Sequence, residues 1–389
     1  MPEVRRLRHA SAERPFIVIW EATQACPLAC HHCRASARPQ RDPAELTTDE
    51  ATGLMAQVAQ FGRPAPLFVI TGGDPFQRPD LTTLVRRGTD LGLAVSVSPS
   101  GTPTLTREAL SRLRDAGARA ISLSLDAAGP AAHDGFRGVA GVYALTTRAW
   151  RDAADLGLKV QINTTVTRRT VDELPDIAAQ VRDRGAMLWS VFFLVPTGRG
   201  RDLAALDAAE TEDVLHLLYD LGETVPVKTT EAHHFRRVCL QRAVLARHGV
   251  PAPKLGPLYR RLRRRLDELG LTSGPQRPRR PPLRVSAGDG FVFVSHRGQV
   301  HPSGFLPLPA GDVRAQSLVD IYRDAPLFQA LRDPDRLGGR CGVCEFRTVC
   351  GGSRARAYAT TGDVHAEEPV CGYQPGSFPY PEELAELTA

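Results

Sequence analysis

An apolar run leads directly into three cysteines in the stretch FIVIWEATQACPLACHHC, residues 16–33. The run 16–20 is short and apolar, which is typical of a buried strand. Cys26, Cys30 and Cys33 therefore fall on a loop at the carboxyl end of that strand. In folds built from parallel strands the chemistry gathers at those ends. The stretch predicts a parallel sheet whose first loop carries three thiols.

Further short apolar runs alternate with amphipathic stretches through the first half of the chain, a pattern typical of repeated β-α units. We expect strands at 16–20, 67–70, 94–97, 120–125, 159–163 and 188–193. We expect helices at 49–61, 81–91, 107–116, 142–156 and 171–184. Thr47 and Glu50 have the spacing of a capping box before the first helix. Six such units favour an α/β fold, a partial (β/α)6 TIM-like barrel.

The alternation stops after about residue 205, which suggests a division of the chain. We expect an N-terminal tail at 1–15, the barrel at 16–205, a helical connector with an Arg- and Pro-rich linker at 206–284, and a small α+β region at 285–389. A hairpin is expected at 288–300, with Arg297 and Gly298 in its turn.

Composition excludes several classes of protein. The chain has 389 residues and no apolar run long enough to span a membrane. Its formal charge is +6, but 43 acidic residues are interspersed with the 49 basic ones, so nucleic acid is not an expected partner. The N-terminus lacks the apolar core of a signal peptide, which predicts a cytoplasmic protein. Eight cysteines in that compartment are not expected to form disulfides.

The first cysteine cluster has the spacing of an iron–sulfur site. Three thiolates at this spacing can bind three irons of a [4Fe–4S] cube and leave the fourth iron without a protein ligand. The amine and carboxylate of S-adenosylmethionine could occupy that iron. The alternative is a zinc site in which His31 or His32 supplies the fourth ligand.

Glu21-x4-Cys26-x3-Cys30-x-His32-Cys33 resembles the radical S-adenosylmethionine (radical SAM) superfamily, in which an aromatic residue usually precedes the third cysteine. The segment 71–75, TGGDP, looks like the Gly-Gly-Glu-Pro motif of that family. Asp74 replaces the usual Glu, so we expect the backbone carbonyls of Gly72 and Gly73 to carry more of the contact. The resemblance implies that S-adenosylmethionine is bound by Gly72, Gly73, Asp74, Pro75, Ser122, Ser124, Asn163, Leu194, Val195 and Pro196.

A second cluster lies near the end of the chain and comprises Cys341, Cys344, Cys350 and Cys371. Four thiolates can saturate either a [4Fe–4S] cube or a zinc ion. The surrounding sequence resembles the C-terminal auxiliary-cluster region called SPASM, or its shorter twitch form, which implies one auxiliary [4Fe–4S] cluster. Ser303 and Ser353 stand where a full SPASM region has further cysteines.

The resemblance implies an enzyme that reductively cleaves S-adenosylmethionine to a 5′-deoxyadenosyl radical, which then abstracts a hydrogen atom from a substrate. It also implies an electron donor such as flavodoxin or ferredoxin. The C-terminal region looks most like the haem-pathway members, so we expect a tetrapyrrole side chain as substrate and decarboxylation or a related modification as the reaction. A chain rich in arginine could bind the carboxylates of such a polyanion.

Three alternatives remain open: a peptide maturase, a decarboxylase or dehydrogenase of a sugar-nucleoside or other natural-product intermediate, and a non-catalytic iron–sulfur redox protein. Beyond the barrel, His233 or His234 could bind an axial or carboxylate group of the substrate. Cys239 is our hypothesis for a catalytic residue that donates a hydrogen atom to a product radical. The competing interpretation of Cys239 is a buried core thiol.

Overall fold

The computed structural model describes residues 10–273 and 276–388, so most of the predicted N-terminal tail lies outside it. One ten-stranded sheet organises the chain, in the order β10-β9-β8-β1-β2-β3-β4-β5-β6-β7. The strands from β8 through β1 to β7 are all paired in parallel. Strand β9 pairs antiparallel with both β8 and β10. The sheet is open, with edges at β7 and β10, and this confirms the predicted partial barrel.

All six predicted strands are present, with ends that differ from the expected ones by at most three residues. They are β1 (Ile17–Glu21), β2 (Leu67–Thr71), β3 (Ala94–Val97), β4 (Ala120–Ser124), β5 (Lys159–Val166) and β6 (Leu188–Phe193). The predicted hairpin is also present as β8 (Phe291–Val294) and β9 (Gln299–His301), with the short β10 (Gly311–Asp312) beside β9. Gly298 in its turn has φ +88°, a conformation that favours glycine.

Two strands extend the sheet beyond the six predicted ones. The segment expected to be a helical connector contributes β7 (Val227–Thr230), which pairs with β6. Its sequence, VKTT, lacks the apolar run that marks a buried strand, so periodicity could not reveal it. On the opposite side β8 pairs in parallel with β1, so the C-terminal region also contributes to the barrel sheet.

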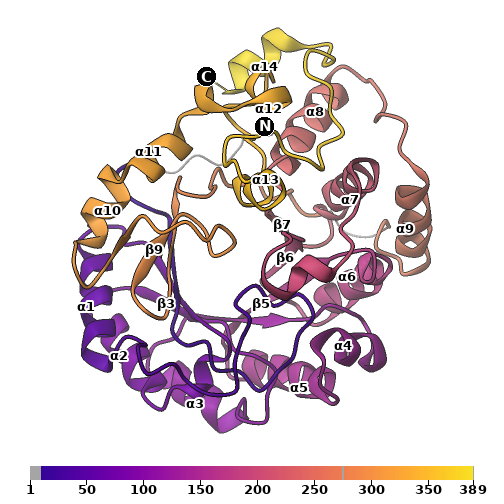
Figure 1. Ribbon diagram of the computed structural model, residues 1–389. Coiled ribbons are helices and arrows are strands. Elements are labelled where there is room, and N and C mark those ends of the chain that lie inside the picture. Colours follow the sequence, from indigo (N-terminus) through magenta and orange to yellow (C-terminus); the bar gives the residue numbers. More distant parts are fainter. Residues whose placement is uncertain (1–9, 274–275, 389) are drawn as a thin grey trace.

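Helices cover the outer face of the curved sheet, as Figure 1 shows. Over β1 to β7 they are α1 (Thr48–Ala59), α2 (Leu81–Asp90), α3 (Arg107–Asp115), α4 (Pro130–Arg137), α5 (Val142–Asp155), α6 (Leu174–Asp183) and α7 (Ala208–Leu221). Thr47 and Glu50 form the predicted capping box at the start of α1. The remaining helices are α8 (Phe235–Arg247), α9 (Pro257–Glu268), α10 (Leu318–Asp324), α11 (Pro326–Arg332), α12 (Gly339–Gly342), α13 (Arg354–Thr361) and α14 (Pro381–Thr388).

Within the described ranges no helix is both long and apolar enough to cross a membrane. Four 3-10 helices complete the assignment for this part of the chain: η1 (Pro75–Gln77), η2 (Val171–Glu173), η3 (Gly198–Asp202) and η4 (Pro334–Arg336). The predicted helix at 171–184 is therefore split between η2 and α6.

Alternation along the strands separates an outer core from an inner face. Every second residue packs outward against the helices, as Val18 and Trp20 of β1 do, and both are fully buried. Two large apolar clusters result, one over β1 to β3 and β8, the other over β4 to β7. The residues that alternate along each strand with these outward-facing ones face the inside of the barrel. They keep partial exposure, as Ser122 and Asn163 do.

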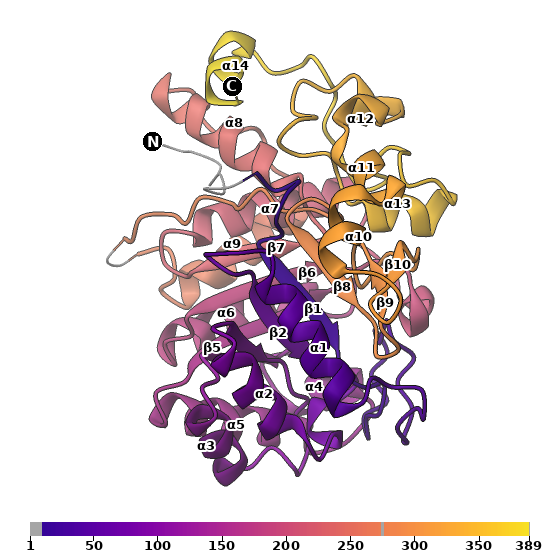
Figure 2. The same cartoon turned by 90° about the vertical axis from the view of Figure 1, so that its left-hand side faces the viewer.

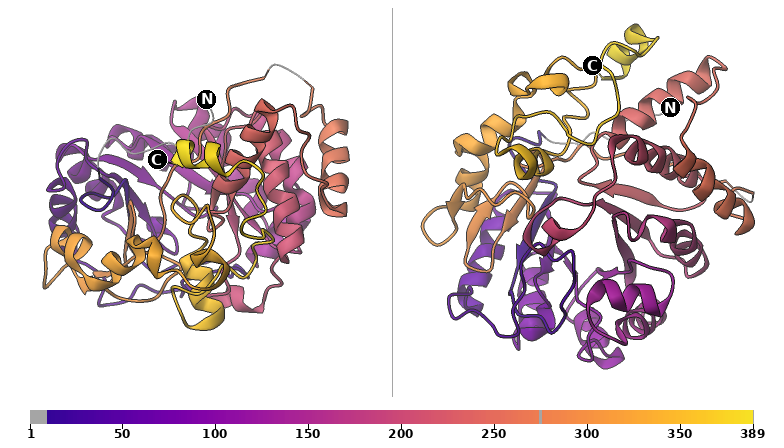
Figure 3. Two further views of the ribbon diagram at one scale, coloured as in Figure 1. Left: turned by 90° about the horizontal axis from the view of Figure 1, so that it is seen from above. Right: turned by 45° about the vertical axis from the view of Figure 1, so that its right-hand side comes forward.

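The C-terminal region contacts both sides of the parallel sheet, β1 on one side and the ends of β6 and β7 on the other. Helix α8 packs against the segment that carries the second cysteine cluster and against α14, and Figures 1 and 2 show these parts together. In both views of Figure 3 the orange and yellow C-terminal segments lie together on one side of the molecule. Arg356 of α13 donates hydrogen bonds to the carbonyls of Phe193 and Leu194, at the end of β6, and of Glu231, directly after β7.

Candidate functional site

The three N-terminal cysteines share one loop after β1. Cys26 and Cys30 are buried and Cys33 is half-buried, and they belong to one small apolar cluster with Leu28 and Val142. All three are free thiols. Burial raises the pKa of Cys26 to about 11, so this thiol would lose its proton only when a metal binds. A loop with three unpaired thiols fits a cluster that leaves one iron open.

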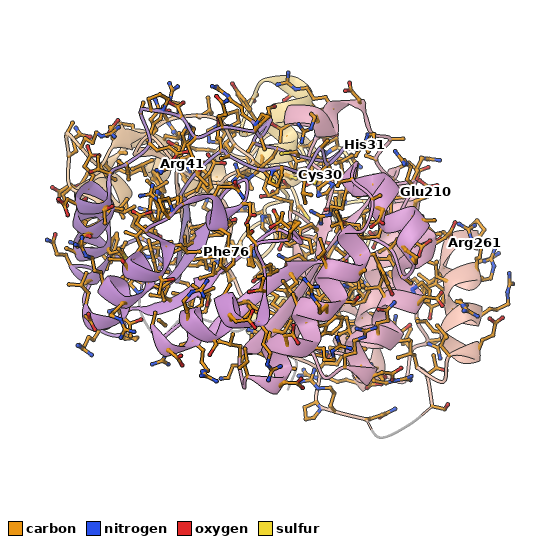
Figure 4. All side chains as sticks on the ribbon, turned by 90° about the horizontal axis from the view of Figure 1, so that it is seen from below. Cys30, His31, Arg41, Phe76, Glu210 and Arg261 are labelled. Atoms are coloured by element: carbon orange, nitrogen blue, oxygen red, sulfur yellow. The ribbon has the colours of Figure 1, made fainter. Side chains whose placement is uncertain are left out.

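Figure 4 shows Cys30 and the exposed His31 next to each other on this loop. The following His32 turns inward, and its ring stacks on Phe136 with 4.6 Å between the ring centroids. Burial lowers the pKa of His32 to about 4, which makes its ring neutral at physiological pH. His32 thus occupies the aromatic position that the family motif has before the third cysteine.

The Gly-Gly segment lies directly against the approach to the cysteine loop. The amide of Gly73 donates to the Thr23 carbonyl and the amide of Asp74 donates to the Ala25 carbonyl, both at 2.7 Å. A Cβ atom at Gly73 would lie 2.5 Å from the Ala25 oxygen, and one at Gly72 would lie 2.5 Å from the Thr23 oxygen. Only glycine permits this approach, because no side chain fits between the two backbones.

The carboxylate of Asp74 is turned into the protein. It is fully buried, and it accepts hydrogen bonds from the Thr102 hydroxyl at 2.9 Å and from the Ser100 amide at 3.4 Å. Burial raises the pKa of Asp74. The Ser100 hydroxyl also donates to the Gly73 carbonyl at 2.9 Å and lies 3.7 Å from the Cys26 sulfur. Ser100 and Thr102 follow β3 and link the glycine segment to the cysteine loop.

Ser122, Ser124 and Asn163 share the inner face of the barrel. The pairing of β4 with β5 places Ser124 beside Asn163 and Ser122 beside Gln161. Asn163 accepts a hydrogen bond from the Gln161 amide at 2.7 Å. All four polar side chains keep partial exposure, while the residues that alternate with them are buried in the outer core. The structure therefore brings these three predicted residues together at neighbouring strands.

The loop after β6 folds back on the cysteine loop. Leu194 and Val195 are buried, and Pro196 is half-buried. Beyond them Arg199 donates from its amide to the Cys33 carbonyl at 3.0 Å and from its Nε to the Cys30 carbonyl at 2.8 Å. The loop after β6 thus contacts the backbone of the cysteine loop, as the glycine segment after β2 also does.

An ion pair behind the cysteine loop was not predicted from the sequence. Arg137, near the end of α4, lies 2.5 Å from the Asp126 carboxylate and 3.7 Å from the Cys30 sulfur. Burial alone would raise the pKa of Asp126, but Arg137, together with His32 and His133, outweighs it and lowers that pKa. A guanidinium held in this way donates a charge-assisted hydrogen bond toward the thiol.

The four C-terminal cysteines line one pocket. Cys341, Cys344, Cys350 and Cys371 face it together with His234, Arg237 and Tyr373. Burial raises the pKa of Cys344 to about 11 and that of Cys350 to about 12. In the described part of the chain neither ring nitrogen of the buried His234 has a hydrogen-bond partner. Four free thiols around a shared pocket fit the donor set of a fully ligated cluster.

No three His, Cys, Asp or Glu side chains in the described ranges lie close enough together to hold a single metal ion.

His233, the neighbour of His234, lies 3.3 Å from Arg236 through its Nδ1 atom. Of the two predicted histidines, His234 therefore lines the pocket of the auxiliary cysteines.

Cys239 lies on α8 and packs against the large outer core over β4 to β7. Burial raises the pKa of its thiol to about 12. This environment is that of a core thiol, the interpretation weighed against a catalytic role above. The catalytic role of Cys239 stays a prediction.

A model of the radical SAM superfamily matches residues 20–181. The AdoMet-dependent heme synthase of Methanosarcina barkeri is 38% identical over 369 residues, which cover 94% of this chain and 99% of that protein. The AdoMet-dependent heme synthase of Nitratidesulfovibrio vulgaris is 39% identical over 363 residues, which cover 92% of each chain.

Among solved structures, Streptococcus suis SuiB bound to S-adenosylmethionine has a similar fold, with a TM-score of 0.65 and 16% identity over 93% of this chain and 78% of that one. The superfamily uses a [4Fe–4S] cluster and S-adenosylmethionine. On the extent of its similarity to the heme synthases and the match to the superfamily model, this chain belongs to the radical SAM superfamily of enzymes.

Proposed function

We propose that this enzyme removes the carboxyl carbon from a propionate side chain of a tetrapyrrole. The observation that carries the proposal is the similarity to AdoMet-dependent heme synthases, which extends over 94% of the chain. The arginine content agrees with a polyanionic substrate, because guanidinium groups pair with carboxylates in two-point contacts.

Cys26, Cys30 and Cys33 would hold the cluster that binds S-adenosylmethionine. When bound, the cluster and S-adenosylmethionine together supply a 5′-deoxyadenosyl radical that abstracts a hydrogen atom from the substrate. Gly72 and Gly73 would face the amino group of S-adenosylmethionine with their backbone, as proposed from the motif. The buried carboxylate of Asp74 would act through Ser100 and Thr102, which it orients, because both donate hydrogen bonds to it.

The inner face of the barrel would hold the nucleoside part of S-adenosylmethionine. Ser122, Ser124 and Asn163 offer hydroxyl and amide groups on neighbouring strands. Leu194, Val195 and Pro196 would contact the adenine at the end of β6. The surrounding barrel would exclude water from the reacting atoms, which protects a reactive radical from side reactions.

Cys341, Cys344, Cys350 and Cys371 would hold an auxiliary [4Fe–4S] cluster, which supplies electron transfer when bound. Full ligation by four thiolates leaves no iron open for substrate. Arg237 lies over the Tyr373 ring at 4.8 Å and lines the same pocket, so a positive charge would stand beside the thiolates.

An electron donor such as flavodoxin or ferredoxin would approach the first cysteine loop. A cleft beside this loop is lined by His31, Arg169 and Arg199, and Arg169 is exposed. An acidic surface on the donor would complement these basic side chains. Replacing Arg169 with Glu should slow reduction by flavodoxin and leave reduction by dithionite unchanged, whereas Arg261→Glu, far from Cys30 in Figure 4, should affect neither.

The proposed reaction is tested with anaerobically reconstituted enzyme, S-adenosylmethionine, a reductant and iron coproporphyrin III, a porphyrin with four propionates. We expect 5′-deoxyadenosine together with a porphyrin that has lost carboxyl groups as CO2, both detected by mass spectrometry. If 5′-deoxyadenosine forms but every porphyrin offered keeps all its carboxyl groups, the tetrapyrrole proposal is wrong. A precursor peptide would then be the next substrate class to test.

A further inference from the structure

A row of polar side chains crosses the inner face of the barrel and ends in a lysine. Backbone pairing joins Ser124 to Asn163, Asn163 to Ser190 and Ser190 to Lys228, one residue on each of the strands β4 to β7. The residues that precede them, Leu123, Ile162, Trp189 and Val227, all belong to the outer core. Side chains alternate along a strand, so the four polar residues point to the inside.

This row connects the proposed nucleoside site to Lys228. Neighbouring strands are about 4.8 Å apart, so the backbone of Lys228 lies about 10 Å from that of Asn163. Ser190 lies between them, and its hydroxyl is 3.1 Å from the Thr230 hydroxyl. The inner surface beside S-adenosylmethionine is therefore polar as far as the edge strand β7.

Lys228 has no counter-charge in the part of the chain that the structure describes. It is half-buried, and its ammonium makes no hydrogen bond or ion pair with a residue in those ranges. Burial lowers its pKa to about 8, and the nearby charge that lowers it further is another cation, Arg280. The chain has two other lysines, Lys159 and Lys254, and both are exposed. A half-buried ammonium with no partner on the protein is available to pair with an anionic ligand.

We propose that Lys228 binds a carboxylate of the substrate. This inference rests on the proposed function and deepens it, since it assigns a contact to one of several carboxylates on the same molecule. The reacting carbon must lie next to S-adenosylmethionine, whereas Lys228 lies two strands beyond Asn163. Lys228 therefore holds a carboxylate that does not react in that turnover, and it orients the substrate so that another propionate reaches the radical.

The test measures binding and needs no turnover. Holoenzyme with both clusters and S-adenosylmethionine is titrated with metal-free coproporphyrin III, and binding is followed by quenching of porphyrin fluorescence. Lys228→Gln should raise the dissociation constant about tenfold or more, because it removes an enclosed charged hydrogen bond. Lys228→Arg keeps the charge and should stay within a fewfold of wild type. Lys254→Gln removes an exposed lysine and should change nothing.

A thermal melt of the same proteins separates this role from a structural one. If Lys228 serves only to bind ligand, Lys228→Gln should unfold at about the same temperature as wild type, because its ammonium has no partner on the protein to lose. Wild-type affinity in Lys228→Gln would overturn the inference and leave the proposed function standing. No porphyrin binding by wild type would overturn both. A lower unfolding temperature together with weaker binding in Lys228→Gln and Lys228→Arg alike would assign the residue a structural role instead.

Discussion

At the scale of single residues, the site depends on close contacts between backbones. Gly73 lies so near the Ala25 carbonyl that a Cβ atom would be 2.5 Å from it. Ser100 then contacts both the Gly73 carbonyl and the Cys26 sulfur. The proposed S-adenosylmethionine contacts and the cysteine loop are thus parts of one rigid unit, and a small change in one part should displace the other.

Gly73→Ala should weaken S-adenosylmethionine binding by roughly tenfold or more, because its methyl group would push the glycine segment away from the cysteine loop. It should also destabilise the fold by about 1–3 kcal/mol. Isothermal titration of the reconstituted enzyme measures the first effect. Gly135→Ala is the matched control, since nothing lies within 4 Å of the added methyl group in α4. Equal affinity in both variants would argue against the proposed backbone contact.

Arg137 provides a second test at this scale. Its guanidinium donates toward the Cys30 sulfur at 3.7 Å and is held by Asp126. Hydrogen bonds and positive charge near a thiolate favour the reduced form of a bound cluster. Arg137→Gln should therefore shift the midpoint potential of the first cluster to a more negative value in a redox titration followed by EPR.

Arg199→Gln is the control for that titration, because Arg199 contacts the Cys30 carbonyl rather than its sulfur. Its potential should move less than that of Arg137→Gln. An unchanged potential in Arg137→Gln would show that the ion pair with Asp126 serves folding alone.

At the scale of elements, the sequence predicts those helices, strands and turns whose structure depends on residues close together in the chain. The six parallel strands, the capping box of α1 and the hairpin β8-β9 follow from periodicity, capping chemistry and a turn glycine. Strand β7 could not be predicted, because VKTT has no apolar run and forms a strand only by pairing with β6. Likewise, neither Ser100 nor Arg137 belongs to a recognisable sequence motif. Each contacts the cysteine loop only because the fold brings the end of β3 and helix α4 next to that loop.

The capping box also carries a dependence on pH. A hydrogen bond from Arg314, at 2.6 Å, and one from the Thr47 amide, at 2.8 Å, lower the pKa of Glu50 from 4.5 to about 2. The charged form is therefore favoured by folding. The contribution of the Glu50 carboxylate to the stability of the fold is complete above the pKa of the unfolded state, about 4.5. It declines as the pH falls from there toward about 2.

Glu50→Gln should cost about 1 kcal/mol of stability at pH 7, since the ion pair is largely exposed and screened by solvent. The difference from wild type should shrink as the pH is lowered from 5 to 3. Thermal unfolding followed by circular dichroism measures it. Asp49→Asn removes a charge from the same helical turn and serves for comparison. A difference that stays constant with pH would contradict the assigned hydrogen bonds.

At the scale of the whole molecule, the C-terminal region is an integral part of the barrel. Strand β8 joins β1, and Arg356 of α13 binds the carbonyls that follow β6 and β7. Arg356 also pairs with the buried Glu368 at 2.9 Å. In addition, Ser303 and Ser353 both donate to the buried Glu231. A network of hydrogen bonds thus joins the C-terminal region to the carboxyl ends of β6 and β7.

Arg356→Gln should lower stability by about 3–5 kcal/mol, because it leaves the Glu368 carboxylate buried without its partner. The loss should appear as a lower unfolding temperature and as faster loss of iron from the C-terminal cysteines. Arg323→Gln changes an exposed arginine paired with Glu13 and should have little effect. Equal stability of the two variants would show that α13 is held to the barrel by apolar contacts instead.

The central claim is that Cys26, Cys30 and Cys33 hold a cluster open to S-adenosylmethionine, while the four C-terminal cysteines hold a closed one. The most direct measurement is iron counting and EPR after anaerobic reconstitution, with and without S-adenosylmethionine. We predict about eight irons per chain in wild type and about four in Cys26→Ala/Cys30→Ala/Cys33→Ala, with an EPR signal that responds to S-adenosylmethionine only in wild type. Zinc in place of iron, or a wild-type signal indifferent to S-adenosylmethionine, would contradict it.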